Sequence, residues 1–365
     1  MLITKLLNVF SHLFDSKSEH YFIVEELDNG IETTEAKIEN ESRKITLNKQ
    51  EALVSLADLK RPFVPINNLV LALSTKNATT IQSSINLRRA NNDEPIGEES
   101  LDSMVFKSFW EFLNRYRAFA ANKMGISDSE IVLANIEIVD IELDRYKVFN
   151  PLGFKGKNLT LTLRGTFVPR DILRVMERVR GWSNNLVVME GLSIVSKALP
   201  NTKDYVIYPQ TKTTSVFSLG EENMHHKDFP WGTSFIVENI AKNLSVDYDV
   251  SEAILKRYVV DGFSKKVNRI VEASIRESLE GLAKVLPHNL RGGDYHFRLN
   301  VGQINSVSFR NWLESKDYNI DIRDTNPHKN YDATLVYLTQ NYSLPHYQFL
   351  NQLLKRRSKW LITNL

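Results

Sequence analysis

Few side chains in this sequence have the type and spacing that catalysis requires. Lys212 lies between two strand-like stretches, where its ammonium group is either a phosphate contact or an ordinary solvated charge. His225 and His226 are adjacent, but no carboxylate or third histidine stands at metal-ligand spacing, so no metal site is predicted. Nucleophile-elbow, zinc-protease and phosphate-loop motifs are all missing from the sequence. We therefore name no catalytic residue.

Three carboxylates form a second polar pattern. Asp140, Glu142 and Asp144 alternate along a predicted strand, which places them on one face of it. Such an acidic row is either a solvated strand edge or a contact for a partner protein.

The composition narrows the chemistry further. The 365 residues include no cysteine, which excludes disulfides, thiolate metal sites and a cysteine nucleophile, and fits a reducing cytoplasm. With 46 basic and 44 acidic residues the net charge is only +2, so nucleic acid is not an expected partner. The hydrophobic share of 42% is ordinary for a globular protein. At roughly 100 to 200 residues per domain, the length suggests two or three folding units.

The N-terminal residues 1–17 are predicted to form an amphipathic helix. Asn8, Ser11 and His12 interrupt its apolar stretch and no small-residue cleavage site follows, so it does not resemble a signal peptide. The helix is either a second membrane anchor or a docked, partner-binding helix. Nowhere does the sequence reach the ~20 consecutive apolar residues that a membrane span needs.

The C-terminal residues 349–365 form a second amphipathic pattern, with no acidic residue. The segment is either a membrane-surface helix or a helix docked on the protein's own core with Arg357 at the edge, and we favour the membrane. The predicted membrane-binding residues are Phe349, Leu350, Leu353, Leu354, Lys355, Arg356, Arg357, Lys359, Trp360 and Leu361.

Hydrophobic periodicity predicts alternating strands and helices along the rest of the chain. In the first half, strands are expected at 21–27, up to 38, 68–74, 131–143 and 159–167, and helices at 49–58, 101–119 and 171–179. In the second half, strands are expected at 186–188, 205–208, 213–219, 295–301 and 333–338, and helices at 234–244, 249–258 and 265–285. Such alternation favours sheets with helices packed on their faces.

The stretch from Ile136 to Pro169 carries the most specific motif. Between two predicted strands it reads Asn150-Pro151-Leu152-Gly153-Phe154-Lys155-Gly156-Lys157-Asn158-Leu159. This resembles a phrase of the form Asn-Pro-Leu-Gly-x-x-Gly-x-x-Leu in the bacterial cell-division protein FtsA family. There the hairpin belongs to subdomain 1C, a small SHS2-like α+β insert that faces division partners or neighbouring protomers. The resemblance implies partner contacts at Asn150, Pro151, Leu152 and Gly153, with Asp140, Glu142 and Asp144 on the same module.

Two other stretches are similar to the same family. Phe229-Pro230-Trp231-Gly232-Thr233 resembles its Pro-x-Gly-Gly sequence before a helix, and Arg276-Glu277 resembles part of its Ile-x-x-Arg-x-x-Glu-type helix with altered spacing. An amphipathic C-terminal helix is a further family feature, which holds those proteins on the inner membrane. The fold implied is α/β: an actin-like, ribonuclease H-like, two-lobed fold with an inserted α+β subdomain.

This resemblance divides the chain into five parts. They are an N-terminal helix at 1–17, the first part of subdomain 1A at 18–82, the 1C insert at 83–181, the rest of 1A with the second lobe at 182–340, and a linker with the membrane helix at 341–365.

The resemblance also indicates where a nucleotide would bind. Actin-like ATPases hold phosphates on two glycine-rich turns, because glycine lets backbone N–H groups come close, and an aspartate in each turn organises the metal. The first turn has no counterpart near Val24–Gly30. The second, Asp-x-Gly-Gly-Gly-Thr-Thr, aligns with Tyr208–Thr214, which lacks the aspartate and all three glycines. The residues left to contact a phosphate are Lys212, Thr213, Thr214 and Gly232. ATP with magnesium is therefore a doubtful ligand, and the site is predicted to be degenerate.

Together these features predict an FtsA-like adaptor, cytoplasmic and peripheral on the inner membrane. Its expected partners are the membrane surface, the tubulin-like division protein, other divisome proteins and, through polymerisation, copies of itself. Two alternatives stay open: a pilus-assembly scaffold of the PilM type, and an ATPase with unorthodox phosphate turns.

Overall fold

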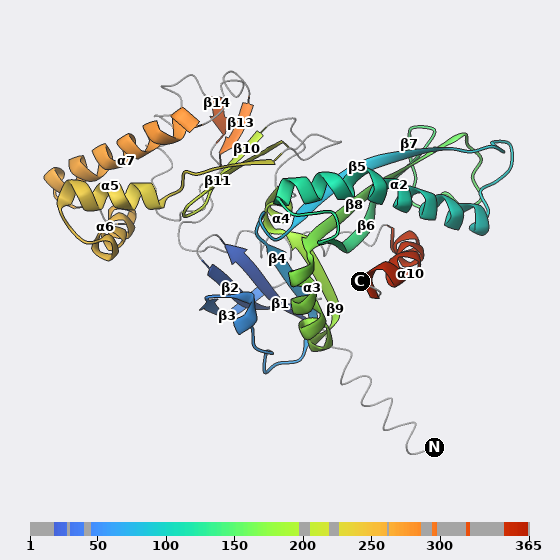
Figure 1. The fold of residues 1–365 in the computed structure, drawn as a ribbon, viewed down its shortest axis with the longest axis horizontal. Helices are drawn as coiled ribbons and strands as arrows, with labels where there is room; N and C mark the ends of the chain where they lie inside the picture. The colour runs from blue at the N-terminus through green and yellow to red at the C-terminus, as the bar shows by residue number, and fades with distance from the viewer. Residues whose placement is uncertain are drawn as a thin grey trace, which may run out of the picture. The chain divides into compact units, whose positions relative to one another are not determined.

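A computed structural model describes residues 18–27, 30–39, 45–196, 205–218, 226–260, 263–285, 294–297, 319–321 and 347–363. The described residues belong to two compact units, the first drawn from residues 1–80, 85–194 and 344–365 and the second from residues 81–84 and 195–343. Both contain sheets and helices, so the predicted α/β class is confirmed (Figure 1). The helix predicted at 1–17 lies outside the described residues.

The first unit contains a five-stranded sheet of order β3-β2-β1-β4-β9. Its strands are β1 (Ser18–Leu27), β2 (Gly30–Glu39), β3 (Ile45–Leu53), β4 (Ile66–Leu73) and β9 (Ser183–Glu190). The first three form an antiparallel meander, whereas β4 runs parallel to β1 and β9 parallel to β4. Strand β4 is a nearly continuous apolar run, as expected for a parallel strand with both faces covered, and Leu69, Val70 and Leu71 are fully buried.

The helix predicted at 49–58 is wrong. Residues 45–53 form β3, which pairs with β2, and only a short 3-10 turn, Leu56–Asp58, follows. The polar residues of this segment suit a helix, but pairing with an existing strand outweighs that local preference. Ser55 and Asp58 cap the turn reciprocally: the Ser55 hydroxyl accepts from the Ala57 N–H, and the Asp58 carboxylate accepts from the Ser55 N–H.

Between β4 and β9 the chain inserts an α+β module, whose order of elements is close to that predicted. It contains β5 (Thr79–Arg88), α2 (Glu98–Met124), β6 (Ile131–Leu143), β7 (Tyr146–Lys147), β8 (Asn158–Pro169) and α3 (Arg170–Val179), with the sheet order β5-β8-β6-β7. Helix α2 covers the sheet with Phe109 and Phe112, both fully buried. A Cβ on Gly165 would lie 2.5 Å from the Phe112 ring, so this glycine of β8 is needed for the helix to pack.

The second unit repeats the topology of the first sheet. Strands β10 (Tyr205–Pro209), β11 (Thr214–Ser218) and β12 (His226–Phe229) form an antiparallel meander, and β13 (Asp294–Phe297) and β14 (Asn319–Asp321) add in parallel. The order β12-β11-β10-β13-β14 is the order of the first sheet, element for element. Two lobes of one topology are what the predicted two-lobed fold requires.

Three helices complete the described part of the second unit: α5 (Ser234–Leu244), α6 (Tyr248–Val260) and α7 (Lys265–Val285). Their apolar faces share one core with Trp231, including the buried Ile236, Ile240, Leu255 and Leu279. The strand predicted at 333–338 lies outside the described residues. A 3-10 turn at Arg180–Trp182 and α10 (Gln348–Thr363) are in the first unit, and α4 (Gly191–Ser196) begins there and ends in the second.

Candidate functional site

Two glutamates lie at the carboxyl ends of the parallel strands in the first sheet. Ligand sites of α/β sheets usually form outside these strand ends. Glu26 comes near the end of β1, and Glu190 is the last residue of β9. Neither glutamate is predicted from the sequence, although each follows a buried stretch of strand, which is the signal that could identify it.

Glu26 binds the end of β4. One carboxylate oxygen accepts hydrogen bonds from the Ser74 N–H and hydroxyl, both at 3.0 Å, and the other accepts from the Asn77 side chain at 2.6 Å. Three donors therefore satisfy this carboxylate within the chain.

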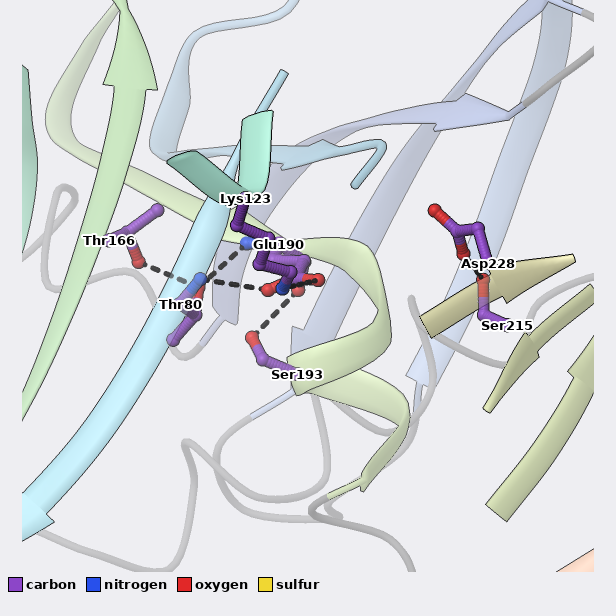
Figure 2. Close-up of polar contacts among 7 residues, drawn as sticks. All are labelled: Thr80, Lys123, Thr166, Glu190, Ser193, Ser215 and Asp228. Atoms are coloured by element: carbon purple, nitrogen blue, oxygen red, sulfur yellow. Dashed lines mark hydrogen bonds and ion pairs between the residues drawn. The ribbon is translucent and has the colours of Figure 1, made fainter. Parts of the chain in front are cut away.

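Glu190 is fully buried and joins the first sheet to the inserted module (Figure 2). Its carboxylate accepts from the Thr80 N–H at 2.8 Å and lies 3.5 Å from the Lys123 ammonium group. Its backbone N–H donates to the Thr80 hydroxyl at 3.0 Å, which is 2.9 Å from the Thr166 hydroxyl. The Ser193 hydroxyl donates to the Glu190 carbonyl at 2.7 Å. A buried carboxylate with an ammonium partner and an N–H donor is a structural tie.

This edge of the sheet shows no metal-binding arrangement. Both carboxylates are occupied by N–H, hydroxyl or ammonium donors, which a cation would have to displace. In the described part of the chain, no group of three or more histidine, aspartate or glutamate side chains could hold a metal ion. What the geometry provides is a fixed position for the module relative to β4 and β9.

The predicted phosphate residues of the second unit lie around the turn between β10 and β11. The turn closes on itself, since the Gln210 N–H donates to the Thr213 carbonyl at 2.7 Å. Lys212 is exposed at its tip, whereas Thr214 is buried and its hydroxyl donates to the Trp231 carbonyl at 2.7 Å. Beside it, the Ser215 hydroxyl donates to the Asp228 carboxylate across the β11–β12 pair (Figure 2).

The start of α5 is bound directly to this turn. The Thr233 N–H donates to the Gln210 carbonyl at 2.9 Å, and the Ser234 N–H donates to the Thr211 carbonyl at 2.8 Å. A Cβ on Gly232 would lie 2.3 Å from the Thr211 carbonyl oxygen, so Gly232 serves this close approach. The first N–H groups of a helix often bind anions, but here two of them are used by the turn. The structure thus brings Lys212, Thr213, Thr214 and Gly232 together. The backbone N–H groups of Thr233 and Ser234, which could bind a phosphate, already donate to carbonyls of the turn.

The predicted membrane helix, α10, packs on the inserted module, against β6 and α2 (Figure 1). Leu350 and Leu354 are buried, while Phe349, Lys355 and Arg356 are exposed and Leu353 is half-buried. Lys359, Trp360 and Leu361 belong to the last turns of the helix. Two of the apolar side chains expected to enter a membrane therefore pack within the protein in this structure.

Polar contacts fix α10 on the edge of β6. The Asn351 side chain accepts from the Ile138 N–H at 2.7 Å and donates to the Ile138 carbonyl at 3.1 Å. The Tyr347 hydroxyl donates to the Asp140 carboxylate at 3.0 Å, and burial together with this bond raises the pKa of Tyr347 to about 12. Asn351 thus pairs with β6 as a neighbouring strand would.

Further along α10, Arg357 pairs with Asp102 on α2 and lies over the ring of Phe106, 5.4 Å from its centroid. The pKa of Asp102 is lowered, chiefly by its hydrogen bond from Arg357. Arg357, the basic residue that interrupts the apolar face, therefore contacts the module.

The predicted partner residues Asn150 to Gly153 form a turn. The Asn150 side chain accepts from the Leu152 N–H at 3.1 Å, Pro151 is buried, and Gly153 has a positive φ of 79°. The Gly153 N–H donates to the Ile96 carbonyl at 2.9 Å. These residues shape the loop, and the exposed large side chains flank them.

The predicted acidic row, Asp140, Glu142 and Asp144, makes its contacts largely within the first unit. Asp140 pairs with Lys147 at 2.8 Å as well as with Tyr347, and Glu142 is half-buried opposite Lys147 in the β6–β7 pair. Asp144 accepts from the Lys157 N–H at 3.0 Å and the Asn158 N–H at 2.8 Å, and these bonds lower its pKa.

In class, the chain is an α/β protein, as predicted, and its two five-stranded sheets share one strand order. No family model and no curated protein matches the sequence. Among the described residues, every helix is too short or too polar to span a membrane.

Solved structures resemble the chain at low sequence identity. A PilM–PilN type IV pilus biogenesis complex matches with 13% identity, 89% of this chain and 99% of that chain covered, and a TM-score of 0.41. The ethanolamine utilization protein EutJ from Carboxydothermus hydrogenoformans matches with 10% identity, 88% and 89% coverage, and a TM-score of 0.41. A Bacteroides thetaiotaomicron protein with an actin-like ATPase fold and unknown function matches with 10% identity, 89% and 97% coverage, and a TM-score of 0.42.

Proposed function

We propose that this protein is an actin-fold scaffold that holds a multiprotein machine at the inner membrane and does not use ATP. The proposed machine is the division apparatus, because the Asn150–Leu159 phrase resembles the FtsA family. In this role the inserted module and α10 supply binding surfaces.

The observation that carries the proposal is the closed turn between β10 and β11. It contains neither a carboxylate to organise a metal nor a glycine to admit a phosphate, and its carbonyls occupy the N–H groups of Thr233 and Ser234. A bound phosphate would need these donors, or others in their place. In the proposed role, a protein of this fold without the phosphate site acts by binding other molecules on its surface.

Helix α10 has two faces in this role. Leu350, Asn351 and Leu354 hold it on the module, whereas the side chains of Phe349 and Arg356 are exposed. In the proposed arrangement the docked helix presents its outer, basic side to the anionic membrane surface. Each basic residue near such a surface contributes ~1 kcal/mol of binding energy.

A pull-down of the full chain with the C-terminal peptide of the tubulin-like division protein tests the role. We expect capture by the peptide and not by a scrambled peptide, unchanged when ATP and magnesium are added. No capture would contradict the division role and favour a pilus or other envelope scaffold, while capture that requires ATP would contradict the non-catalytic proposal.

A further inference from the structure

We infer that the loop of residues 145–157, called the outer loop below, binds the anionic headgroups of a phospholipid surface and is the protein's main membrane contact. The inference rests on the proposed function as a membrane scaffold and names a surface that the FtsA resemblance assigned to partner proteins.

Exposed aromatic side chains are the first observation. Tyr146, Phe149 and Phe154 are 76%, 68% and 55% exposed, although they lie within one short loop. Apolar side chains gathered in this way mark an interaction surface, because isolated exposed residues need no partner whereas a cluster does. Tyrosine favours the membrane–water interface, and phenylalanine enters the boundary between headgroups and acyl chains.

The charge of the loop is the second observation. Residues 145–157 include Arg145, Lys147, Lys155 and Lys157 and no acidic residue. Lys147 pairs with Asp140, and the charge of Lys157 helps to lower the pKa of Asp144, whereas Arg145 and Lys155 form no ion pair among the described residues. A basic surface beside exposed aromatic rings complements anionic headgroups over an acyl layer.

A pocket of about 420 Å³ at the base of the loop is the third observation. It is lined by Arg88, Arg89, Ala90, Asn92 and Lys157, with no acidic side chain. The Arg89 guanidinium donates to the Gly156 carbonyl at 2.8 Å and the Glu94 carbonyl at 2.9 Å, so it fixes the pocket wall. The exposed Arg88 and Lys157 remain to bind a phosphate group.

Hydrogen bonds to Ile96 and Asp144, which lie outside the loop, hold it in place. Ile96 accepts from the Gly153 N–H and donates to the Phe154 carbonyl, both at 2.9 Å, and Asp144 accepts from the Lys157 N–H. The aromatic rings are therefore presented by a formed loop, which lowers the entropic cost of binding.

A membrane surface fits this loop better than an acidic peptide does. Peptides are usually bound in a groove or along a free strand edge. The β6 edge at Ile138 is already covered by Asn351, and the outer loop lies at the far end of the four-stranded sheet, around β7 (Figure 1). Phe149 also contacts Tyr347, with ring centroids 6.5 Å apart, which places the loop next to the start of α10.

Vesicle co-sedimentation of the full chain, with phosphatidylglycerol-containing and pure phosphatidylcholine vesicles, tests the inference. We expect binding to the anionic vesicles only. The triple variant Tyr146→Ser, Phe149→Ser, Phe154→Ser should bind at least ~10-fold more weakly because the rings no longer enter the interface. The double variant Arg88→Ser, Lys157→Ser should bind roughly 30-fold more weakly, at ~1 kcal/mol per cation. The matched control is Arg170→Ser, Arg174→Ser on α3, which removes two exposed cations that belong to neither the loop nor α10 and should bind within ~3-fold of wild type.

The outcomes separate the inference from the function on which it rests. Unchanged binding by both loop variants, with vesicle binding by the wild-type chain intact, would overturn the inference and leave the membrane scaffold standing. No vesicle binding by the wild-type chain would contradict the membrane role itself. If vesicle binding is lost when an acidic peptide is added but not when salt is added, the loop is a peptide site, and this result would also overturn the inference.

The fluorescence of a dye attached to the loop gives a second test, in which the aromatic and basic side chains of the loop are kept. Because the chain has no cysteine, Leu152→Cys can carry an environment-sensitive dye as the only labelled site. Its emission should shift to the blue on anionic vesicles, while a dye at the exposed position of Asn184→Cys on β9 should not shift. Equal responses at the two positions would contradict insertion of the loop.

Discussion

The side-chain carboxamide of Asn351 hydrogen-bonds to both backbone groups of Ile138, at 2.7 Å and 3.1 Å. One residue of the C-terminal helix thereby covers an open position on the edge of β6. Natural proteins commonly protect such edges, because unpaired strand groups recruit other strands. The helix is thus part of the module's fold as well as a candidate membrane element.

Replacing Asn351 with alanine should loosen this contact. The Ile138 N–H and carbonyl lose their partner, at a local cost of about 1–3 kcal/mol. Hydrogen exchange should show at least ~10-fold faster exchange at the Ile138 amide. The exposed neighbour gives the matched control, Gln352→Ala, which should exchange like wild type. Equal exchange in all three proteins would mean that the bond does not hold the edge.

The Tyr347 hydroxyl should titrate far above an ordinary tyrosine. Its pKa is raised from 10.0 to about 12 by burial and by the bond to Asp140. Because the pKa is raised in the folded state, the contact of the protonated hydroxyl stabilises the fold fully below pH 10. This contribution is lost as the pH rises through about 12. Comparing ultraviolet titrations of wild type and Tyr347→Phe should reveal one missing group near pH 12; a missing group near pH 10 would contradict the contact.

The stabilising effect of the Asp102–Arg357 pair should be lost at low pH, whereas that of Tyr347 is lost at high pH. The pKa of Asp102 is lowered from 3.8, chiefly by the hydrogen bond from Arg357. The pair therefore contributes its full stability above pH 3.8 and loses it as the pH falls through the lowered pKa. The stability difference between wild type and Asp102→Asn should therefore shrink at acidic pH and also at high salt, because the pair is partly exposed. Urea unfolding at several pH values measures it, and a constant difference would count against the ion pair.

Removing the buried carboxylate of Glu190 should destabilise the first unit. Glu190→Ala leaves the Lys123 ammonium group and the Thr80 N–H without their partner, at a cost of about 3–5 kcal/mol. The control Glu137→Ala removes a more exposed carboxylate, which pairs with Arg164, and should cost under ~1 kcal/mol. Urea unfolding compares them; similar losses would show that Glu190 is not the tie described above.

Gly232→Ala should destabilise the second unit. The new Cβ would overlap the backbone of Thr211 and Lys212, which no flexible side chain can relieve, and we expect a loss of roughly 1–3 kcal/mol or more. Gly181→Ala adds a Cβ with no atom within 4 Å and should be nearly neutral. Thermal unfolding distinguishes them, and a neutral Gly232→Ala would mean that α5 does not rest on the turn as described.

Much of the fold could be predicted because its elements have strong local periodicity. Helix α7 was predicted with the observed bounds, and β6, β8 and α3 within a few residues. Strand β5 was missed although Ile81, Ile85 and Leu87 alternate with polar residues, and β3 was assigned to a helix because its polar residues carry no strand pattern. Both strands are defined by pairing with partners elsewhere in the chain.

The site was less predictable because its contacts join distant residues. An amphipathic helix has the same pattern whether it faces lipid or protein, so the burial of Leu350 and Leu354 could not be read from α10 alone. Asn150 to Gly153 were predicted to contact partners; in the structure they form a turn, and the exposed rings of Phe149 and Phe154 lie beside it. Glu190 meets Thr80 across 110 residues of sequence, which local patterns do not reveal.

Equilibrium binding of labelled ATP with magnesium to the full chain tests the central claim most directly. The closed turn predicts no saturable binding at micromolar nucleotide, because the Thr233 and Ser234 N–H groups already have acceptors and no carboxylate or glycine lies in the turn. Lys212→Ala should behave like wild type. Saturable micromolar binding that Lys212→Ala abolishes would contradict the account and identify a working ATP site.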